Sequence, residues 1–267
     1  MHKERRKRTV CPCLGGSMTY EIREMAFAEV LDTAFRLLRD HFVLLVGTSA
    51  ILLVPFQLGL ALVPAMKLRG AGIFGITILL LLVISPFVRA LQAFVIGELY
   101  LGRSVTLGRA YGQILAIFIP LTGTLLLSAL AVTGASLLLL IPGIYFMLAF
   151  ILINQVMVFE RVFGSRALGR SRELMRGNFL RAIGILLLEA IVSGTLSFGL
   201  GLAFRVFHSA WLSGLVAGVS SSVAESLGAA GLVVLYFDIR CRKEAFDLEH
   251  LARLVESSPN LASVPTA

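Results

Sequence analysis

The chain has 267 residues, of which 57% are hydrophobic and only 15% are charged. Soluble domains are about 45–50% apolar and about 25% charged. A water-soluble core therefore cannot hold this apolar content, and lipid must cover part of it. Three cysteines in this length exclude a disulfide-stapled scaffold, and a net charge of +8 raises the question of nucleic-acid binding, which depends on where the charges lie.

Residues 1–18 are rich in Lys and Arg and lack the apolar core of a secretory signal. We expect a basic, disordered tail. An alternative is that translation begins at Met18, because the codons of the Gly-Gly pair just before it can read GGAGG, a bacterial ribosome-binding sequence. Cys11 and Cys13 have no further Cys or His at zinc-binding spacing, so no metal or other cofactor is expected.

Residues 19–40 are predicted to form an amphipathic helix, because apolar side chains recur every three or four residues. These side chains are Phe27, Leu31, Phe35, Leu38 and Phe42. Charged residues occupy the other faces of the helix. Two interpretations stay open: the helix lies in the bilayer interface, or it packs on the cytoplasmic loops.

Six apolar stretches are each long enough to cross the hydrocarbon as a helix, which takes about 20 residues. They are residues 42–66, 71–99, 113–136, 140–159, 179–204 and 209–237. The third and fourth are joined by the sequence IPGIY, which predicts a helical hairpin with its turn near Pro142. The predicted fold class is all-α, a polytopic domain over 19–255 with six transmembrane helices and the interfacial helix. A disordered tail over 256–267 follows.

The basic residues predict an orientation. All of the 24 Lys and Arg residues lie on one side of the predicted bundle except Lys67, Arg69, Arg89 and Arg205. Because basic residues stay cytoplasmic, both termini are expected in the cytoplasm of a bacterial or archaeal cell, with the chain in the inner membrane. The positive charge then contacts anionic lipid headgroups, so the expected partner is the lipid bilayer and not nucleic acid.

Polar side chains at membrane depth are costly and are usually paired or functional. The candidates are Arg89, Gln92, Asn154, Gln155, Glu189 and Glu225. We hypothesise that Arg89 pairs with Glu189 or Glu225 and lines a polar cavity. The alternative is an ion pair, or a protonated glutamate, that only fixes helix packing. Asn154 and Gln155 are expected to make interhelical hydrogen bonds, and the spacing of Gly214 and Gly218 predicts close helix approach.

Two charged segments lie outside the spans. The loop helix predicted to begin at Ser165 carries candidate lipid-headgroup ligands, and the alternative is that they only determine topology. These arginines are Arg166, Arg170, Arg172 and Arg176. The last span ends in charged residues 238–249, interpreted as the helix leaving the membrane, with Tyr236 in the aromatic belt.

No catalytic motif is recognised, and the protein is not expected to be an enzyme. The four histidines are scattered and form neither HExxH nor a Ser-His-Asp arrangement. The sequence GAGIFG matches GxGxxG, but it opens a predicted transmembrane helix with no preceding strand, which dinucleotide binding requires.

Several segments look familiar together: GRSVTLGRAY (102–111), IPGIY (141–145), the loop sequence over 158–185, and LYFDIRCRKEAFDLEHL (235–251). In combination they resemble the six-span family named for the membrane domain of glycerophosphoryl diester phosphodiesterases, over residues 20–255. The terminal motif is the most specific part, and it departs from typical members at Ala245, where they have Gly. The chain has no room for the catalytic barrel, so the resemblance implies a fold and a membrane location only.

Two functions follow as expectations. The first is a non-enzymatic scaffold or accessory component of the membrane, acting with other membrane proteins or as a homo-oligomer. The second is a small transporter or lipid-handling protein using Arg89, Glu189 and Glu225. A polar cavity containing those three groups would favour the second, and a filled bundle centre the first.

Overall fold

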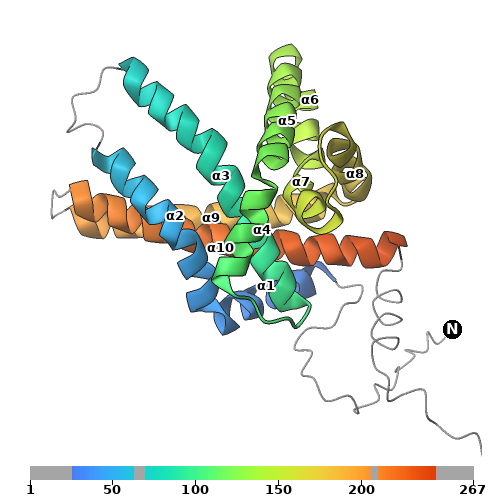
Figure 1. Cartoon of the computed structure of the whole chain (residues 1–267), viewed down its shortest axis with the longest axis horizontal. Helices are drawn as coiled ribbons and strands as arrows, with labels where there is room; N and C mark the ends of the chain where they lie inside the picture. Colours follow the sequence, from blue (N-terminus) through green and yellow to red (C-terminus); the bar gives the residue numbers. More distant parts are fainter. Residues whose placement is uncertain (1–25, 63–69, 206–209, 245–267) are drawn as a thin grey trace, which may run out of the picture.

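The computed structural model describes residues 26–62, 70–205 and 210–244, and these residues form helices and connections without a strand (Figure 1). The predicted all-α class is thus confirmed. The two predicted tails, and residues 19–25 of the predicted amphipathic helix, lie outside the described residues. The helices are α1 (Phe27–Asp40), α2 (Phe42–Leu62), α3 (Gly70–Tyr100), α4 (Leu107–Ala116), α5 (Phe118–Leu138), α6 (Leu140–Ala149), α7 (Ile153–Gln155), a π-helix (Val156–Glu160), α8 (Ser165–Met175), α9 (Phe179–Arg205) and α10 (Ala210–Glu244).

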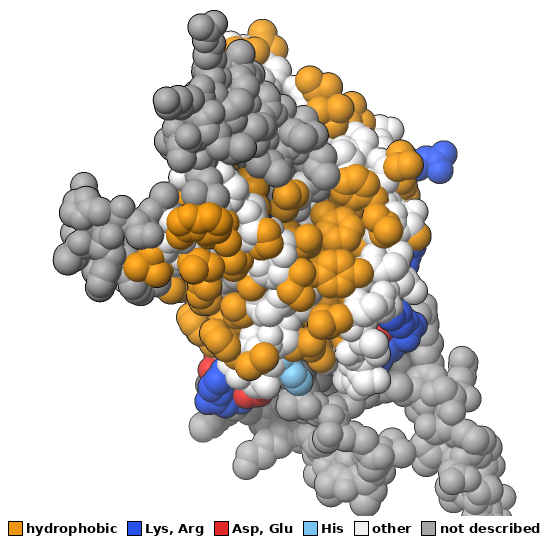
Figure 2. Space-filling view, turned by 60° about the vertical axis from the view of Figure 1, so that its left-hand side comes forward, with side chains coloured by type: hydrophobic (Ala, Val, Ile, Leu, Met, Phe, Trp, Pro, Cys, Tyr) orange, Lys and Arg blue, Asp and Glu red, His pale blue; other side chains and the backbone are white. Residues whose placement is uncertain are grey.

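Five helical segments of the described chain are long and apolar enough to cross a membrane. They are Phe42–Ala61, Phe118–Leu138, Ile141–Glu160, Phe179–Gly199 and Trp211–Glu244. The remaining predicted span, 71–99, falls within α3, whose side chains are described only from residue 84 onward, so a sixth span stays a prediction. Figure 2 shows a face whose middle is covered by apolar side chains, with most of its charged side chains near the lower edge.

Two predicted spans differ from the structure in detail. The third, 113–136, is not one helix, because the chain breaks at Ile117 between α4 and α5. The fourth, 140–159, is divided into α6, α7 and the π-helix. The reversal between α5 and α6 occurs at Leu139, which is extended, so IPGIY lies in the first turns of α6 instead of forming the turn. Pro142 fits there because the first helical turn needs no N–H donor.

Helix α10 is the centre of the fold, and α2 and α9 pack along it (Figure 1). Small residues permit this close approach. A Cβ atom at Gly218 would lie 2.7 Å from Val54 Cα, and one at Gly214 would lie 3.0 Å from Leu58 Cα. On the side of α10 that faces α9, a Cβ atom at Gly231 would lie 2.9 Å from Ile185 Cγ2. The predicted close packing through Gly214 and Gly218 is therefore confirmed.

A buried set of hydrogen bonds joins α2, α3 and α10. Gln92 Nε2 donates to the carbonyl oxygen of Leu45 at 2.8 Å and to Ser226 Oγ at 3.1 Å. The hydroxyls of Ser49 and Ser226 lie 3.3 Å apart. In a surrounding without water these bonds satisfy groups that would otherwise be costly to bury. Gln92 thus belongs to the packing of the three helices.

Helix α1 packs against α10 through Val30, Ala34 and Leu37, which are fully buried. Only part of the predicted stripe is buried with them: Phe35 is 45% exposed and Phe42 is 46% exposed. Packing on the bundle therefore accounts for one side of this helix. Its placement in the bilayer interface stays a prediction, for which the two exposed phenylalanines supply apolar contacts.

Candidate functional site: a polar cavity at membrane depth

A cavity of about 520 Å³ lies between the α5–α6 hairpin, α9 and α10, and we call it the membrane cavity. Its polar lining consists of Arg89, Ser128, Asn154, Gln155, Glu189, Ser193 and Glu225. Apolar side chains such as Leu125, Phe150 and Leu186 form the rest of the wall. Apart from Arg89 on α3, these residues belong to segments apolar enough to span a membrane. The cavity therefore places polar groups where lipid tails would otherwise be.

Arg89 and Glu225 form the predicted ion pair. Arg89 Nε lies 3.4 Å from Glu225 Oε1, and the two side chains are 56% and 20% exposed. Arg89 thus sits at the open side of the cavity, while Glu225 lies deeper. Attraction between opposite charges is strong where water is excluded, so this pair stabilises both charges at membrane depth.

Glu189 faces the same cavity but is left out of the pair. Its carboxyl group packs against Gly228 of α10, where any larger residue would collide with it. Within the described part of the chain, Glu189 has no ion pair or hydrogen bond. The cavity thus holds one guanidinium and two carboxyl groups, and only one of the carboxyl groups is paired with the guanidinium.

Asn154 and Gln155 line the cavity, but their side-chain oxygens are buried and, within the described chain, unpartnered. The two residues are 8% and 3% exposed. Among the described residues, neither Asn154 Oδ1 nor Gln155 Oε1 has a hydrogen-bond partner, so these oxygens do not make the predicted interhelical hydrogen bonds. An unpaired buried polar group costs about 1–3 kcal/mol of stability. Because the two oxygens are themselves closed off from the cavity, we do not assign them to a ligand.

Most, but not all, of the residues of this site are predictable from the sequence. Gln92 was grouped with Arg89, yet it lies outside the cavity and bonds to α2 and α10 instead. Ser128 was not recognised, because a serine in an apolar helix carries no distinguishing pattern. Within residues 26–62, 70–205 and 210–244, no three His, Cys, Asp or Glu side chains lie close enough together to hold a metal ion.

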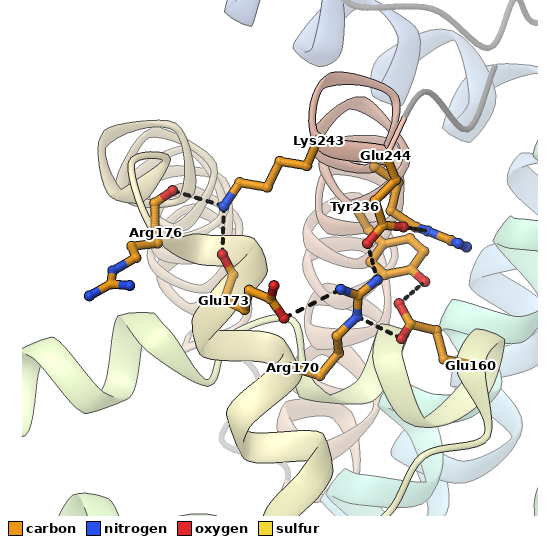
Figure 3. A network of polar contacts seen from close by, with 8 residues as sticks. Glu160, Arg170, Glu173, Arg176, Tyr236, Lys243 and Glu244 are labelled. Atoms are coloured by element: carbon orange, nitrogen blue, oxygen red, sulfur yellow. Dashed lines mark hydrogen bonds and ion pairs between the residues drawn. The ribbon is translucent and has the colours of Figure 1, made fainter. Parts of the chain in front are cut away.

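The loop arginines differ sharply from one another, and Arg170 is not available to a lipid. It lies 2.8 Å from Glu160 and 3.5 Å from Glu173, and it also pairs with Glu244 (Figure 3). Glu160 in turn accepts a hydrogen bond from Tyr236. Burial alone lowers the pKa of Arg170, but hydrogen bonds and charges from Glu160 and Glu244 outweigh burial and raise this pKa above its ordinary value. Arg170 therefore stays positively charged and is the centre of this network of ion pairs.

The other three arginines of this loop are more open. Arg172 donates to the hydroxyl of Tyr145 at 3.1 Å and lies over its ring. Arg176 contributes its backbone carbonyl to Lys243, while its guanidinium points away from the network (Figure 3). Arg166 is exposed and has no ion pair within the described chain. Of the predicted headgroup ligands, only Arg166 and Arg176 keep free guanidinium groups.

The charged end of the last span connects α10 to the loop and to α9 through hydrogen bonds and ion pairs. Asp238 is fully buried and accepts hydrogen bonds from Arg181 on α9 and from Arg242 at 3.1 Å. Lys243 donates to backbone carbonyls at the end of α8. Tyr236 is also fully buried, so its assignment to an aromatic belt is wrong. The change from apolar to charged residues marks a buried polar network and not only an exit into water.

Reversing the charges of Arg89 and Glu225 tests whether these two side chains form an ion pair in the membrane cavity. Arg89→Glu would place three carboxyl groups together and is expected to lower the thermal stability of the detergent-purified protein. Adding Glu225→Arg restores one cation beside the new carboxylate and is expected to recover most of that loss. The measurement is the midpoint of thermal unfolding, with Arg89→Glu/Glu189→Arg as the matched control that should recover less. Equal recovery in both double variants would contradict pairing with Glu225.

The fold and this cavity define a class: a multi-pass α-helical membrane protein with a polar site among its helices. Comparison with models of protein families, with curated proteins and with solved structures finds no match.

Proposed function

We propose that this is a small transporter or lipid-handling protein of the inner membrane, which binds an amphipathic molecule in the membrane cavity. The observation that carries the proposal is the combination of Arg89, two carboxyl groups and two amide side chains with apolar walls in one cavity. Polar groups would bind the head of such a molecule, and apolar walls its hydrocarbon part. Such binding needs no covalent chemistry, so the proposed protein is not an enzyme.

The topology is part of the proposal. Counting α3 as a span yields six, which returns both termini to the cytoplasm together with most of the basic residues. The resemblance of the loop and terminal motifs to the six-span membrane-domain family, which stays a prediction, implies the same count. A scaffold or accessory function is the second candidate, because Gln92 is buried between α2, α3 and α10 and its Nε2 bonds to both neighbouring helices.

The transport or lipid-handling function and the scaffold function predict different results when the amide groups of Asn154 and Gln155 are removed. Asn154→Leu and Gln155→Met remove polar atoms of similar volume, so each is expected to raise the free energy of unfolding by about 1 kcal/mol. The same variants are expected to lose the compound that the wild-type protein retains. The measurements are thermal unfolding in detergent and mass spectrometry of small molecules and lipids that co-purify from native membranes.

Glu189→Gln supplies the complementary test, since the amide keeps the shape of the side chain and removes its charge. Retention of the co-purified compound should fall while protein level and unfolding temperature stay unchanged. The control is Asp32→Asn, which removes an exposed carboxylate on α1. If the cavity variants lose stability and retain the same compounds as wild type, the scaffold function is the better description.

A further inference from the structure

A second cavity, of about 330 Å³, lies near the charged ends of α3 and α10, away from the membrane cavity. Four arginines from four different segments line it: Arg103 after α3, Arg109 on α4, Arg161 after the π-helix and Arg240 on α10. Aromatic side chains of Phe94, Phe159 and Phe237 contribute to its wall. We call it the arginine cavity.

The charges of the arginine cavity do not balance. Among the described residues that line it, Glu98 is the only carboxylate, and it pairs with Arg103 at 3.1 Å. Arg240 pairs with Glu244 at 2.9 Å, but Glu244 is shared with Arg170. Several like charges gathered around one cavity repel one another and attract an anion.

Arg109 and Arg161 carry this excess charge. Arg161 donates to the neutral amide oxygen of Gln113 at 2.6 Å, so its charge is not compensated there. Arg109 is exposed and has no ion pair or hydrogen bond within the described chain. These two guanidinium groups therefore have donors left for a ligand.

The backbone at Arg161 is a second, independent observation. Arg161 has φ of +55°, and it is the only residue other than glycine with positive φ in the described part of the chain. It directly follows the π-helix Val156–Glu160, and π-helical turns occur frequently at functional sites. Glycine would adopt this conformation without strain. An arginine held in it, facing a cavity, indicates that the side chain itself is needed.

We propose that the arginine cavity binds a phosphate-bearing anion, with Arg109 and Arg161 as its main ligands. Guanidinium groups present planar pairs of N–H donors that match phosphate oxygens, and such bonds are among the strongest in proteins. The volume suits a phosphate group with an attached moiety better than a single small ion. A lipid headgroup and a soluble phosphate compound share this chemistry. The site is independent of the proposed transport or lipid-handling function.

The experiment uses the full chain and two probes. Inorganic pyrophosphate is titrated calorimetrically into detergent-purified protein, and retention of phosphatidic acid is measured by native mass spectrometry after reconstitution into mixed phosphatidylcholine nanodiscs. Arg109→Gln and Arg161→Asn are each expected to weaken binding about tenfold or more. Asn tolerates the left-handed backbone, so the second variant keeps the local fold. Arg36→Gln removes the same charge from an exposed site on α1 that lies outside this cavity and should bind like wild type.

Each outcome decides the proposal. Binding of pyrophosphate alone identifies a soluble phosphate compound, and retention of phosphatidic acid alone identifies a lipid headgroup. In either case, the effects of Arg109→Gln and Arg161→Asn must exceed that of Arg36→Gln. Arg161→Gly should also raise the unfolding temperature by relieving strain while it weakens binding. Failure of wild-type protein to bind either probe, or equal weakening by Arg36→Gln, would overturn the proposal.

Discussion

Gly218→Leu is expected to force α2 away from α10 and to abolish most of the folded protein in detergent. Even a Cβ atom at this position would lie 2.7 Å from the backbone Cα of Val54, which cannot rotate aside as a side chain can. A leucine adds three further carbon atoms to that collision. Overpacking costs typically about 1–3 kcal/mol, and a backbone collision between the most extensively packed helices should reach the upper end of this range.

The measurement is the fraction of protein that elutes as a monodisperse peak after extraction, together with the midpoint of unfolding by sodium dodecyl sulfate. Gly194→Leu on α9 is the matched control, because Gly194 is exposed and a Cβ atom there meets nothing within 4 Å. It should behave like wild type or slightly better, since leucine favours a helix more than glycine does. Equal effects of both variants would show that glycine content, and not the α2–α10 contact, is what matters.

Asp238→Ala is expected to destabilise the protein by about 3–5 kcal/mol, because it removes the fully buried carboxylate to which Arg181 and Arg242 donate. Asp238 is fully buried and joins α9 to the end of α10. Its loss should therefore loosen both helices where they meet the loop. The unfolding midpoint in detergent measures the loss, and limited proteolysis around α8 locates it.

Replacing an aspartate by alanine in an exposed ion pair separates the effect of burial on stability from the effect of charge. Asp32 and Arg36 lie 2.8 Å apart on α1, with side chains 60% and 64% exposed, so Asp32→Ala should cost less than about 1 kcal/mol. Asp238→Asn should fall between the two, because it keeps the shape and some hydrogen bonds but not the charge. If Asp238→Ala costs no more than Asp32→Ala, the network around α10 does not hold the helix in place.

One irregular segment contributes to both cavities. Asn154 and Gln155 face the membrane cavity, whereas Val158, Phe159 and Arg161 face the arginine cavity. Between them the chain changes from α-helix to π-helix. The π-helical turn rotates the following side chains relative to an α-helix, so nearby residues reach two different sites.

The sequence alone was sufficient for the spans that the structure shows, because a segment of about 20 apolar residues is stable in hydrocarbon whatever its neighbours are. The break at Ile117 has a signal that was missed, because Pro120 cannot bond to the carbonyl of residue 116 and so favours the start of a new helix. The break after Ala149 and the π-helix have no nearby Gly or Pro to mark them, since they depend on how α5 to α8 pack. The six-span count and the family resemblance stay predictions.

The sequence was sufficient to predict those site residues whose type is unusual for their position in the chain. Arg89, Glu189 and Glu225 stand out because charge at membrane depth is costly in any fold. Arg166 and Arg170 are both arginines of the same loop, and the sequence does not distinguish them. Only the tertiary structure shows that Arg166 is exposed and that Arg170 pairs with three carboxylates. Hydrophobicity belongs to each residue separately, whereas an ion pair or a cavity depends on distances between segments far apart in the chain.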